Sequence, residues 1–394
     1  MTDHAGAVLQ LARDLVTIDS RSFVSNRAVA DRIEAALAGF ELERLDYRDQ
    51  NGIEKRVLVA HRGPTSDPAG EGASMGGLAL SGHMDTVPET GWRSDPWSGR
   101  IENGRLFGLG STDMKGPLAA AIVAARALPK DVPITLLITA DEETTKAGAR
   151  ELVQRSMLAK LAQPRAIVLV EPTKMIPVRG HRAHVHFTAV ATGVQAHSST
   201  GRGRNANWDM LPFLMEMRAI HERLRKDPAL QDPAYDPPFS DFNLVIDNHG
   251  SAVNVTVPKA TATIKFRYSA KVDPKPVVEM VRAAAQRAGI ALSEAREGNP
   301  PELAPTHPIV RLCSEVTGAP AAVAPYGTDA SELQALASCV ILGPGDIAQA
   351  HAPDECVSIE ELAAAVPIFM HLAQRITVRD EHASDHIRPS VPTS

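Results

Sequence analysis

The sequence has few features of secreted, membrane-bound or nucleic-acid-binding proteins. Its three cysteines, Cys313, Cys339 and Cys356, form neither a CxxC pair nor a disulfide framework. A formal net charge of −6 argues against nucleic acid or an anionic membrane as the main partner. No run of 18 apolar residues predicts a membrane-spanning helix. Charged residues such as Asp14 interrupt the N-terminal segment, which lacks the apolar core of a signal peptide, so we expect a cytoplasmic protein.

What is present indicates an ordinary globular enzyme built from more than one domain. Hydrophobic residues make up 44% of the chain and charged residues 22%, which places it among typical globular proteins. A chain of 394 residues is longer than one hydrophobic core usually sustains. We therefore expect two domains.

Five short segments place metal-binding side chains where apolar, strand-like runs end. They are GHMDTVP with His83 and Asp85, GSTDMKG with Asp113, TADEE with Glu142 and Glu143, LVEPT with Glu171, and QAHAPDE with His351. Two imidazoles and several carboxylates suit a pair of borderline metal ions such as zinc. Of two adjacent glutamates, one can bind a metal while its neighbour stays free as a general base. The set predicts a two-metal hydrolase.

Three continuous apolar runs predict strands that are covered on both faces by helices. They are GLALSG at 77–82, ITLLITA at 134–140 and AIVLV at 166–170. Each run ends at candidate ligands, and open α/β sheets bind ligands beyond the carboxyl ends of their strands. The apolar stretch PLAAAIVAARAL predicts a buried helix with Pro117 in its first turn. We therefore expect an α/β catalytic domain with a mostly parallel sheet.

The pattern changes near Gly180. Segments 184–193 and 261–269 alternate between polar and apolar residues, and helices are expected at about 207–225 and 277–288. This predicts an inserted α+β domain over 180–298, between two parts of the catalytic domain at 1–179 and 299–380. A mobile loop is expected at 63–77 and a loose polar tail at 381–394.

In these segments the chain resembles a family of di-zinc amidohydrolases and exopeptidases. The family includes acetylornithine deacetylase, succinyl-diaminopimelate desuccinylase, aminoacylase and glutamate carboxypeptidase. All five segments occur in the family's order, and the blocks YGTDA and VILGPGDIAQAHAPDE look most like the acetylornithine deacetylase branch. The resemblance implies a metal domain with an inserted lid and dimerisation domain.

The resemblance also implies roles for the metal ligands. Asp113 would bridge two ions, because a carboxylate has two oxygens. His83 and Glu171 would complete the shell of one ion, and Glu143 and His351 that of the other. The ions are expected to be zinc, with cobalt or manganese as substitutes.

Two further acids are assigned to the reaction. Asp85, two residues after His83, is expected to orient the imidazole of that ligand. Glu142 is expected to be the general base, taking a proton from the attacking water and returning it to the leaving amine. Asp141 is a competing candidate, but the family places the base directly before the ligand.

The inserted domain is expected to supply an oxyanion donor and a dimer interface. The family uses a histidine in a motif like VQAHSS to stabilise the oxyanion, which here is His197. It would act from a lid or from a partner subunit. The alternating strand at 184–190 is expected to be an exposed edge strand through which a homodimer forms.

Four residues are candidates for substrate binding. Arg267 in KFRYS suits bidentate capture of a carboxylate, although Lys265 stands where the family usually has an acid. Asn254 could bind the same carboxylate, and Gly327 and Thr328 are expected to line the pocket.

The sequence therefore predicts a hydrolase of N-acyl amino acids, with N-acetylornithine as the first choice of substrate. The alternatives among enzymes are succinyl-diaminopimelate desuccinylase, aminoacylase, and glutamate carboxypeptidase or dipeptidase. A catalytically silent amino-acid- or metal-binding homologue is the alternative outside enzymes. Glu142 beside Glu143 argues against it, because binding alone needs no base.

Overall fold

The computed structural model, described for residues 4–64 and 76–377, divides into two compact units. The first unit contains the residues up to Gly180, Leu303–Ala322 and the residues from Thr328 onward. The second contains His181–Glu302 and Val323–Gly327. Most of the loop expected at 63–77, and all of the tail expected at 381–394, lie outside the described residues.

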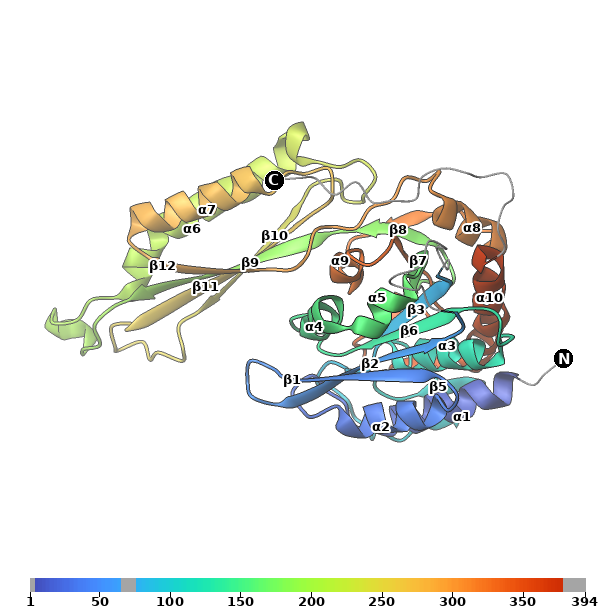
Figure 1. The fold of residues 1–394 in the computed structure, drawn as a ribbon. Coiled ribbons are helices and arrows are strands. Elements are labelled where there is room, and N and C mark those ends of the chain that lie inside the picture. The colour runs from blue at the N-terminus through green and yellow to red at the C-terminus, as the bar shows by residue number, and fades with distance from the viewer. Residues whose placement is uncertain (1–3, 65–75, 378–394) are drawn as a thin grey trace. The chain divides into compact units, whose positions relative to one another are not determined.

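An eight-stranded sheet forms the centre of the first unit, in the order β1-β2-β6-β3-β7-β14-β8-β13 (Figure 1). The strands are β1 (Glu41–Arg48), β2 (Glu54–Arg62), β3 (Leu78–His83), β6 (Ile134–Thr139), β7 (Ala166–Leu169), β8 (Val178–His181), β13 (Ala322–Ala324) and β14 (Cys339–Ile341). The neighbours β6, β3, β7 and β14 pair in parallel, whereas β1–β2, β2–β6 and β14–β8 are antiparallel. The predicted α/β class is confirmed, with a parallel centre and antiparallel strands on both sides.

Helices cover both faces of this sheet, which explains why its central strands are apolar throughout. One face carries α1 (His4–Val16), α2 (Arg27–Ala36), α3 (Lys115–Ala127) and α10 (Ile359–Thr377), with α8 (Pro308–Thr317) packed on α10. The other face carries α4 (Ala147–Arg155), α5 (Met157–Ala162) and α9 (Ala330–Leu333). The predicted helix after Asp113 is α3, which is buried from Lys115 to Ala125.

A small three-stranded sheet lies beside this core. It consists of β15 (Cys356–Ser358), β5 (Arg105–Phe107) and β4 (Arg100–Glu102). It joins the segment before Asp113 to the segment after His351. A short 3-10 helix, η3 (Ile347–Gln349), precedes that histidine.

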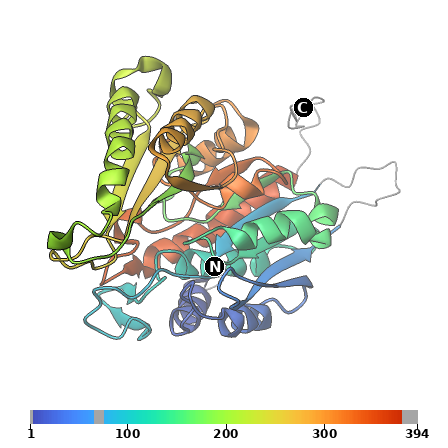
Figure 2. The ribbon, with the colours of Figure 1, turned by 90° about the vertical axis from the view of Figure 1, so that its left-hand side faces the viewer.

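The second unit is an antiparallel sheet with two helices on one face (Figure 2). Its strands, in sheet order, are β10 (Asp241–Asp247), β11 (Lys259–Tyr268), β9 (Ala183–Thr192) and β12 (Ala291–Arg296). Its helices are α6 (Ala206–Lys226) and α7 (Lys275–Ala288), with the 3-10 turns η1 (Ser198–Thr200) and η2 (Pro228–Leu230). Alternate residues of β9 and β11 are buried under the helices, as their sequence pattern predicts.

The prediction that the strand at 184–190 is an exposed edge is wrong. β9 pairs with β11 on one side and with β12 on the other, so its backbone groups are occupied on both sides. The edges of this sheet are β10 and β12. Alternation shows that one face of a strand is solvated, but it does not indicate the strand's position within the sheet.

Within residues 4–64 and 76–377, no helix combines the length and apolarity needed to span a membrane.

Candidate metal centre

Three adjacent parallel strands bring predicted ligands to one edge of the large sheet. His83 is the last residue of β3, Glu171 follows β7 by two residues, and Glu143 follows β6 by four. β3 lies between β6 and β7, so their carboxyl ends meet at a common edge. Asp113 comes from the turn that precedes α3, and His351 from the loop after η3.

The first group of candidate ligands, His83, Asp113 and Glu171, is buried. The Nε2 atom of His83 lies 3.1 Å from Oδ1 of Asp113 and 3.9 Å from Oε2 of Glu171. Two atoms bound to one zinc ion in a tetrahedral site are about 3.4 Å apart. The three side chains are therefore spaced as ligands of a single ion would be.

The second group, Asp113, Glu143 and His351, uses the other oxygen of Asp113. The Nε2 atom of His351 lies 3.5 Å from Oδ2 of Asp113 and 3.1 Å from both carboxylate oxygens of Glu143. Each group offers one ligand atom per residue within 4.8 Å of the others. Asp113 thus has one oxygen near His83 and the other near His351, as a carboxylate that bridges two ions requires.

The charges of this cluster fit divalent cations. Burial raises the pKa of Glu143 and of Glu171, and repulsion from Asp113 raises both further. Buried carboxylates crowded in this way are costly to ionise together unless a cation neutralises them. The imidazoles lie at hydrogen-bonding distance from carboxylates, and the bond to Glu143 raises the pKa of His351 to about 9. Oxygen and imidazole donors suit zinc, cobalt or manganese.

Asp85 supports both the first group and the loop that carries the two glutamates. The Nδ1 atom of His83 lies 3.0 Å from the backbone oxygen of Asp85 and 3.5 Å from its carboxylate. The carboxylate itself accepts hydrogen bonds from the amides of Glu142 and Glu143, at 3.2 and 3.3 Å, and from the hydroxyl of Ser22 at 2.7 Å. The carbonyl of Asp85 therefore orients the imidazole more closely than its carboxylate does.

Glu142 and Asp141 are in different surroundings. The carboxylate of Asp141 accepts a 2.7 Å hydrogen bond from the hydroxyl of Tyr47 and pairs with Lys55 at 3.1 Å. The carboxylate of Glu142 lies 3.9 Å from the ammonium of Lys146. Burial is the main cause that raises the pKa of Glu142 well above its ordinary value. These contacts hold Asp141 in place as a structural group and leave Glu142 as the candidate base.

Glu355 is a supporting residue that the sequence interpretation missed. Its buried carboxylate accepts hydrogen bonds from the amides of Gly110, Thr112 and Asp113 at 3.0, 2.7 and 2.9 Å. It therefore holds the backbone of the shared ligand, and burial raises its own pKa to about 8. Glu355 closes the segment QAHAPDE, but no local pattern shows that an acid points at the backbone of a distant turn.

Two of the candidates in the second unit lie together. The segments of His197 and Asn254 adjoin, because the amide of Ser198 donates to the carbonyl of Asn254 at 3.0 Å and His197 forms a bridge with Val255. Both side chains are exposed. The Nδ1 atom of His197 contacts the hydroxyl of Ser199 at 2.8 Å.

The other substrate candidates have partners within the protein. Arg267 donates to the carboxylate of Asp241, its partner across β10 and β11, at 2.6 Å. Thr328 is 1% exposed, and its hydroxyl accepts from the amide of Ala330 at 3.1 Å. Its carbonyl accepts from the ammonium of Lys146 at 2.9 Å. These contacts engage the hydroxyl and the carbonyl of Thr328 within the protein, and its place in the substrate pocket stays a prediction. Gly327, which precedes it, belongs to the second unit.

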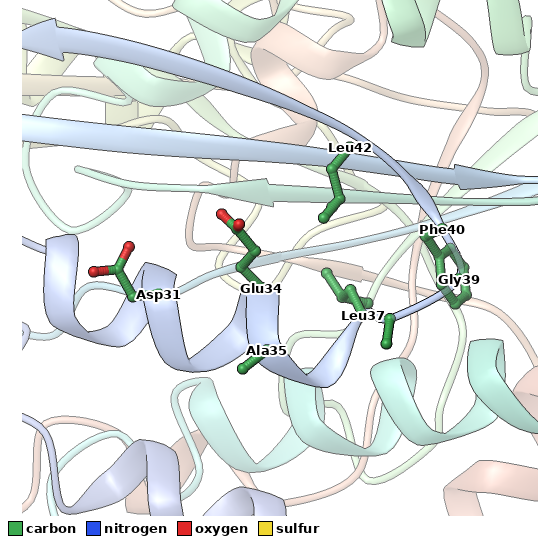
Figure 3. Close-up of a pocket in the computed structure, with 8 residues that line it drawn as sticks. Asp31, Glu34, Ala35, Leu37, Gly39, Phe40 and Leu42 are labelled. Carbon is green, nitrogen blue, oxygen red and sulfur yellow. The ribbon is translucent and has the colours of Figure 1, made fainter.

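A shallow hollow beside α2 is separate from this chemistry. It has a volume of about 430 Å³ and is lined by residues 31, 34, 35, 37–40 and 42 (Figure 3). One of its acids, Glu34, accepts a hydrogen bond from Arg44 at 2.7 Å. None of the lining residues is a predicted site residue.

Comparisons with known proteins identify the family of the chain. Residues 79–375 match peptidase family M20/M25/M40. The acetylornithine deacetylase of Edwardsiella ictaluri is 33% identical over 362 residues, covering 89% of this chain and 92% of that protein. The acetylornithine deacetylase of Myxococcus xanthus is 29% identical over 374 residues, covering 92% of this chain and 95% of that protein.

Solved structures share the fold at low sequence identity. An M20 family metallo-carboxypeptidase from Sulfolobus solfataricus has a TM-score of 0.70 at 17% identity, covering 94% of this chain and 99% of that one. A dinuclear metal-binding M20 peptidase from Bacillus subtilis has a TM-score of 0.61 at 15% identity, covering 95% and 98%. The resemblance inferred from the five segments is confirmed. The chain belongs to peptidase family M20/M25/M40 and is a metal-dependent amidohydrolase.

Proposed function

We propose that this protein removes the acyl group from an N-acyl amino acid, with N-acetylornithine as the preferred substrate. The main support is a buried Asp113 whose two oxygens face two ligand groups, with Glu142 directly beside the ligand Glu143. Relatives named acetylornithine deacetylase span most of the chain and give the choice of substrate. We propose two zinc ions as the bound metals, on the basis of the two imidazoles and three carboxylates.

In this proposal, each residue of the site has a separate role in the reaction. Ions bound at the two groups would polarise the scissile carbonyl and increase the acidity of the attacking water. Glu142 takes the proton of that water and returns it to the leaving amine. The carbonyl of Asp85 orients the imidazole of His83, and its carboxylate holds the backbone amide of Glu142. Glu355 holds the backbone of Asp113.

The remaining groups are proposed to come from the second unit. If Nδ1 of His197 accepts a hydrogen bond from Ser199, its neutral ring carries the proton on Nε2. That N–H is a suitable donor to an oxyanion. Arg267 is the proposed partner of the substrate carboxylate, although a substrate has to compete there with Asp241.

A substrate panel tests this function. The zinc-loaded enzyme should be assayed on N-acetylornithine, N-succinyl-diaminopimelate, other N-acyl amino acids, and dipeptides including one with a C-terminal glutamate. The proposal expects the highest kcat/KM for N-acetylornithine. A higher value for the succinylated substrate or for a dipeptide would assign the enzyme to another branch. Amino-acid binding without turnover of any compound would support the catalytically silent alternative.

We further propose a cytoplasmic homodimer that forms through the second unit. The edge strand β10 exposes Val245 and Ile246, and α6 exposes Trp208 and Met215 two turns apart. An unpaired strand edge and an exposed apolar helix face are features that protein interfaces cover. Light scattering should give twice the 42.1 kDa chain mass. The double variant Trp208→Glu/Met215→Glu should give a monomer.

A further inference from the structure

The loop that carries Glu142 and Glu143 starts at Asp141, whose backbone has an unusual conformation. Asp141 has a φ of 60°, in the left-handed region that non-glycine residues rarely adopt. Its carbonyl accepts hydrogen bonds from the amides of Thr144, Thr145 and Lys146, at 3.3, 3.0 and 2.7 Å. The direction in which Glu142 leaves this turn therefore depends on what holds Asp141.

Two side chains from the outer strands hold the carboxylate of Asp141. Tyr47 of β1 and Lys55 of β2 are directly opposite each other across the antiparallel pair, so both project to the same face. The Tyr47 hydroxyl donates to Oδ2 of Asp141 at 2.7 Å, and the Lys55 ammonium lies 3.1 Å from Oδ1. The carboxylate thus has a hydrogen bond at Oδ2 and an ion pair at Oδ1.

The same lysine also supports the second anchor of the loop. The Lys55 ammonium donates to the carbonyls of Ser22 and Val24 at 2.6 and 2.8 Å. The Ser22 hydroxyl then donates to the carboxylate of Asp85 at 2.7 Å. That carboxylate also accepts hydrogen bonds from the backbone amides of Glu142 and Glu143, as described above. Lys55 is therefore connected to the loop by two routes, one through Asp141 and one through Asp85.

Because Lys55 is buried, its ammonium depends on its contacts within the protein. Its side chain is completely buried, and the carboxylate of Asp141 is 2% exposed. A buried charge that loses its partner is destabilising, so the fold must keep the pair together. The three contacts of the ammonium come from two separate segments of the chain, Ser22–Val24 and Asp141, which limits how far either segment can shift.

We propose that Tyr47 and Lys55 are positioning residues that fix the orientation of Glu142 through Asp141 and Asp85. The inference rests on the proposed role of Glu142 as general base. Neither residue touches the ligand groups, so both should act on turnover and leave the number of bound ions unchanged. A purely structural role would instead alter thermal stability without changing the turnover of the folded enzyme.

The test compares Tyr47→Phe and Lys55→Met with the wild-type holoenzyme. We expect kcat to fall about tenfold for Tyr47→Phe and about a hundredfold for Lys55→Met, as expected when neutral and charged hydrogen bonds are lost. KM should stay within about twofold, and metal analysis should give the wild-type content. Amide hydrogen exchange at Glu142 and Glu143 should be faster in both variants. Tyr268→Phe, which removes the hydroxyl of a buried tyrosine of the second unit, is the matched control.

A double variant separates this inference from the proposed function. In a Glu142→Gln background, Tyr47→Phe should cause no further loss of kcat, because the group that it positions is absent. Independent losses in the double variant would overturn the inference, as would wild-type kcat and exchange rates in Tyr47→Phe. If Lys55→Met does not fold, Tyr47→Phe decides alone. A fully active Glu142→Gln would instead contradict the proposed base.

Discussion

The two ligand groups that share Asp113 are buried to different depths. In the first group, the side chains of His83 and Glu171 are 1% and 6% exposed. In the second, Glu143 is 8% exposed but His351 is 53% exposed. His83 ends a strand of the central sheet, whereas His351 lies in a loop with a positive φ of 61°. One group is built on the rigid core and the other on its margin.

The two histidines also differ in the support of their second nitrogen. The Nδ1 atom of His83 lies 3.0 Å from the carbonyl of Asp85, which fixes the plane of the ring. Within the described part of the chain, no protein hydrogen bond holds Nδ1 of His351. Partners of this kind change metal affinity by about 10–100-fold. From this difference we predict that the first group binds its ion more tightly than the second group does.

The largest predicted effect follows from removing metal in steps. We expect complete chelation to abolish amide hydrolysis, and zinc, cobalt or manganese to restore it. Because the second group is more exposed and less supported, its ion should leave first, with an affinity about 10–100-fold weaker. Metal analysis during stepwise chelation, with activity measured in parallel, checks this. Loss of both ions in a single step would remove the distinction, and full activity without metal would end the two-metal proposal.

The next largest effect separates the base from its neighbouring ligand. Glu142→Ala should lower kcat by about 10²–10⁴-fold while keeping both ions, because only proton transfer is lost. Glu143→Ala should lose the ion of the second group and keep that of the first. Metal content and kcat measured on both variants provide the readout. Equal metal loss in the two variants would contradict the division of roles between these adjacent residues.

Sequence patterns predicted the parallel strands and the candidate ligands at their ends, because a short apolar run ending at a polar side chain carries that information locally. His83, Glu143 and Glu171 follow from β3, β6 and β7 in this way. The two groupings around Asp113 could not be obtained from spacing. They depend on how a turn before α3 and a loop after η3 meet in space, and that expectation came from the family resemblance.

Features that arise from pairing between distant segments were not predictable from local patterns. The position of β9 inside its sheet depends on β12, which lies about a hundred residues further along the chain. The contacts of Tyr47 and Lys55 with Asp141 likewise join segments separated by more than 80 residues. The pairing of Arg267 with Asp241 depends on the register of β10 and β11. For β9 and β11, the local pattern identifies the strand but not its partner.

A smaller effect is expected from the second unit, which should change turnover without changing either metal group. His197→Ala should lower kcat by about a hundredfold through loss of an oxyanion donor, with both ions retained. Mixing inactive His197→Ala and Glu142→Ala subunits should restore part of the activity if the histidine acts on the partner's site. Verified subunit exchange without recovery would exclude action in trans. Loss of metal in His197→Ala would contradict its separation from the ligand groups.

The smallest effect is expected at Arg267, and it should appear in KM alone. Arg267→Met removes a guanidinium proposed to bind the α-carboxylate, so KM should rise about tenfold for N-acetylornithine, as expected for one charged hydrogen bond. The pairing with Asp241 provides a matched control. Asp241→Asn removes the competing anion and should leave KM unchanged or lower it, because the guanidinium is then free for substrate. A substrate analogue with an amide in place of the carboxylate should be poor for the wild type and no worse for Arg267→Met. If both substitutions raise KM equally, for both substrates, the ion pair serves the sheet of the second unit, and substrate recognition must come from other residues.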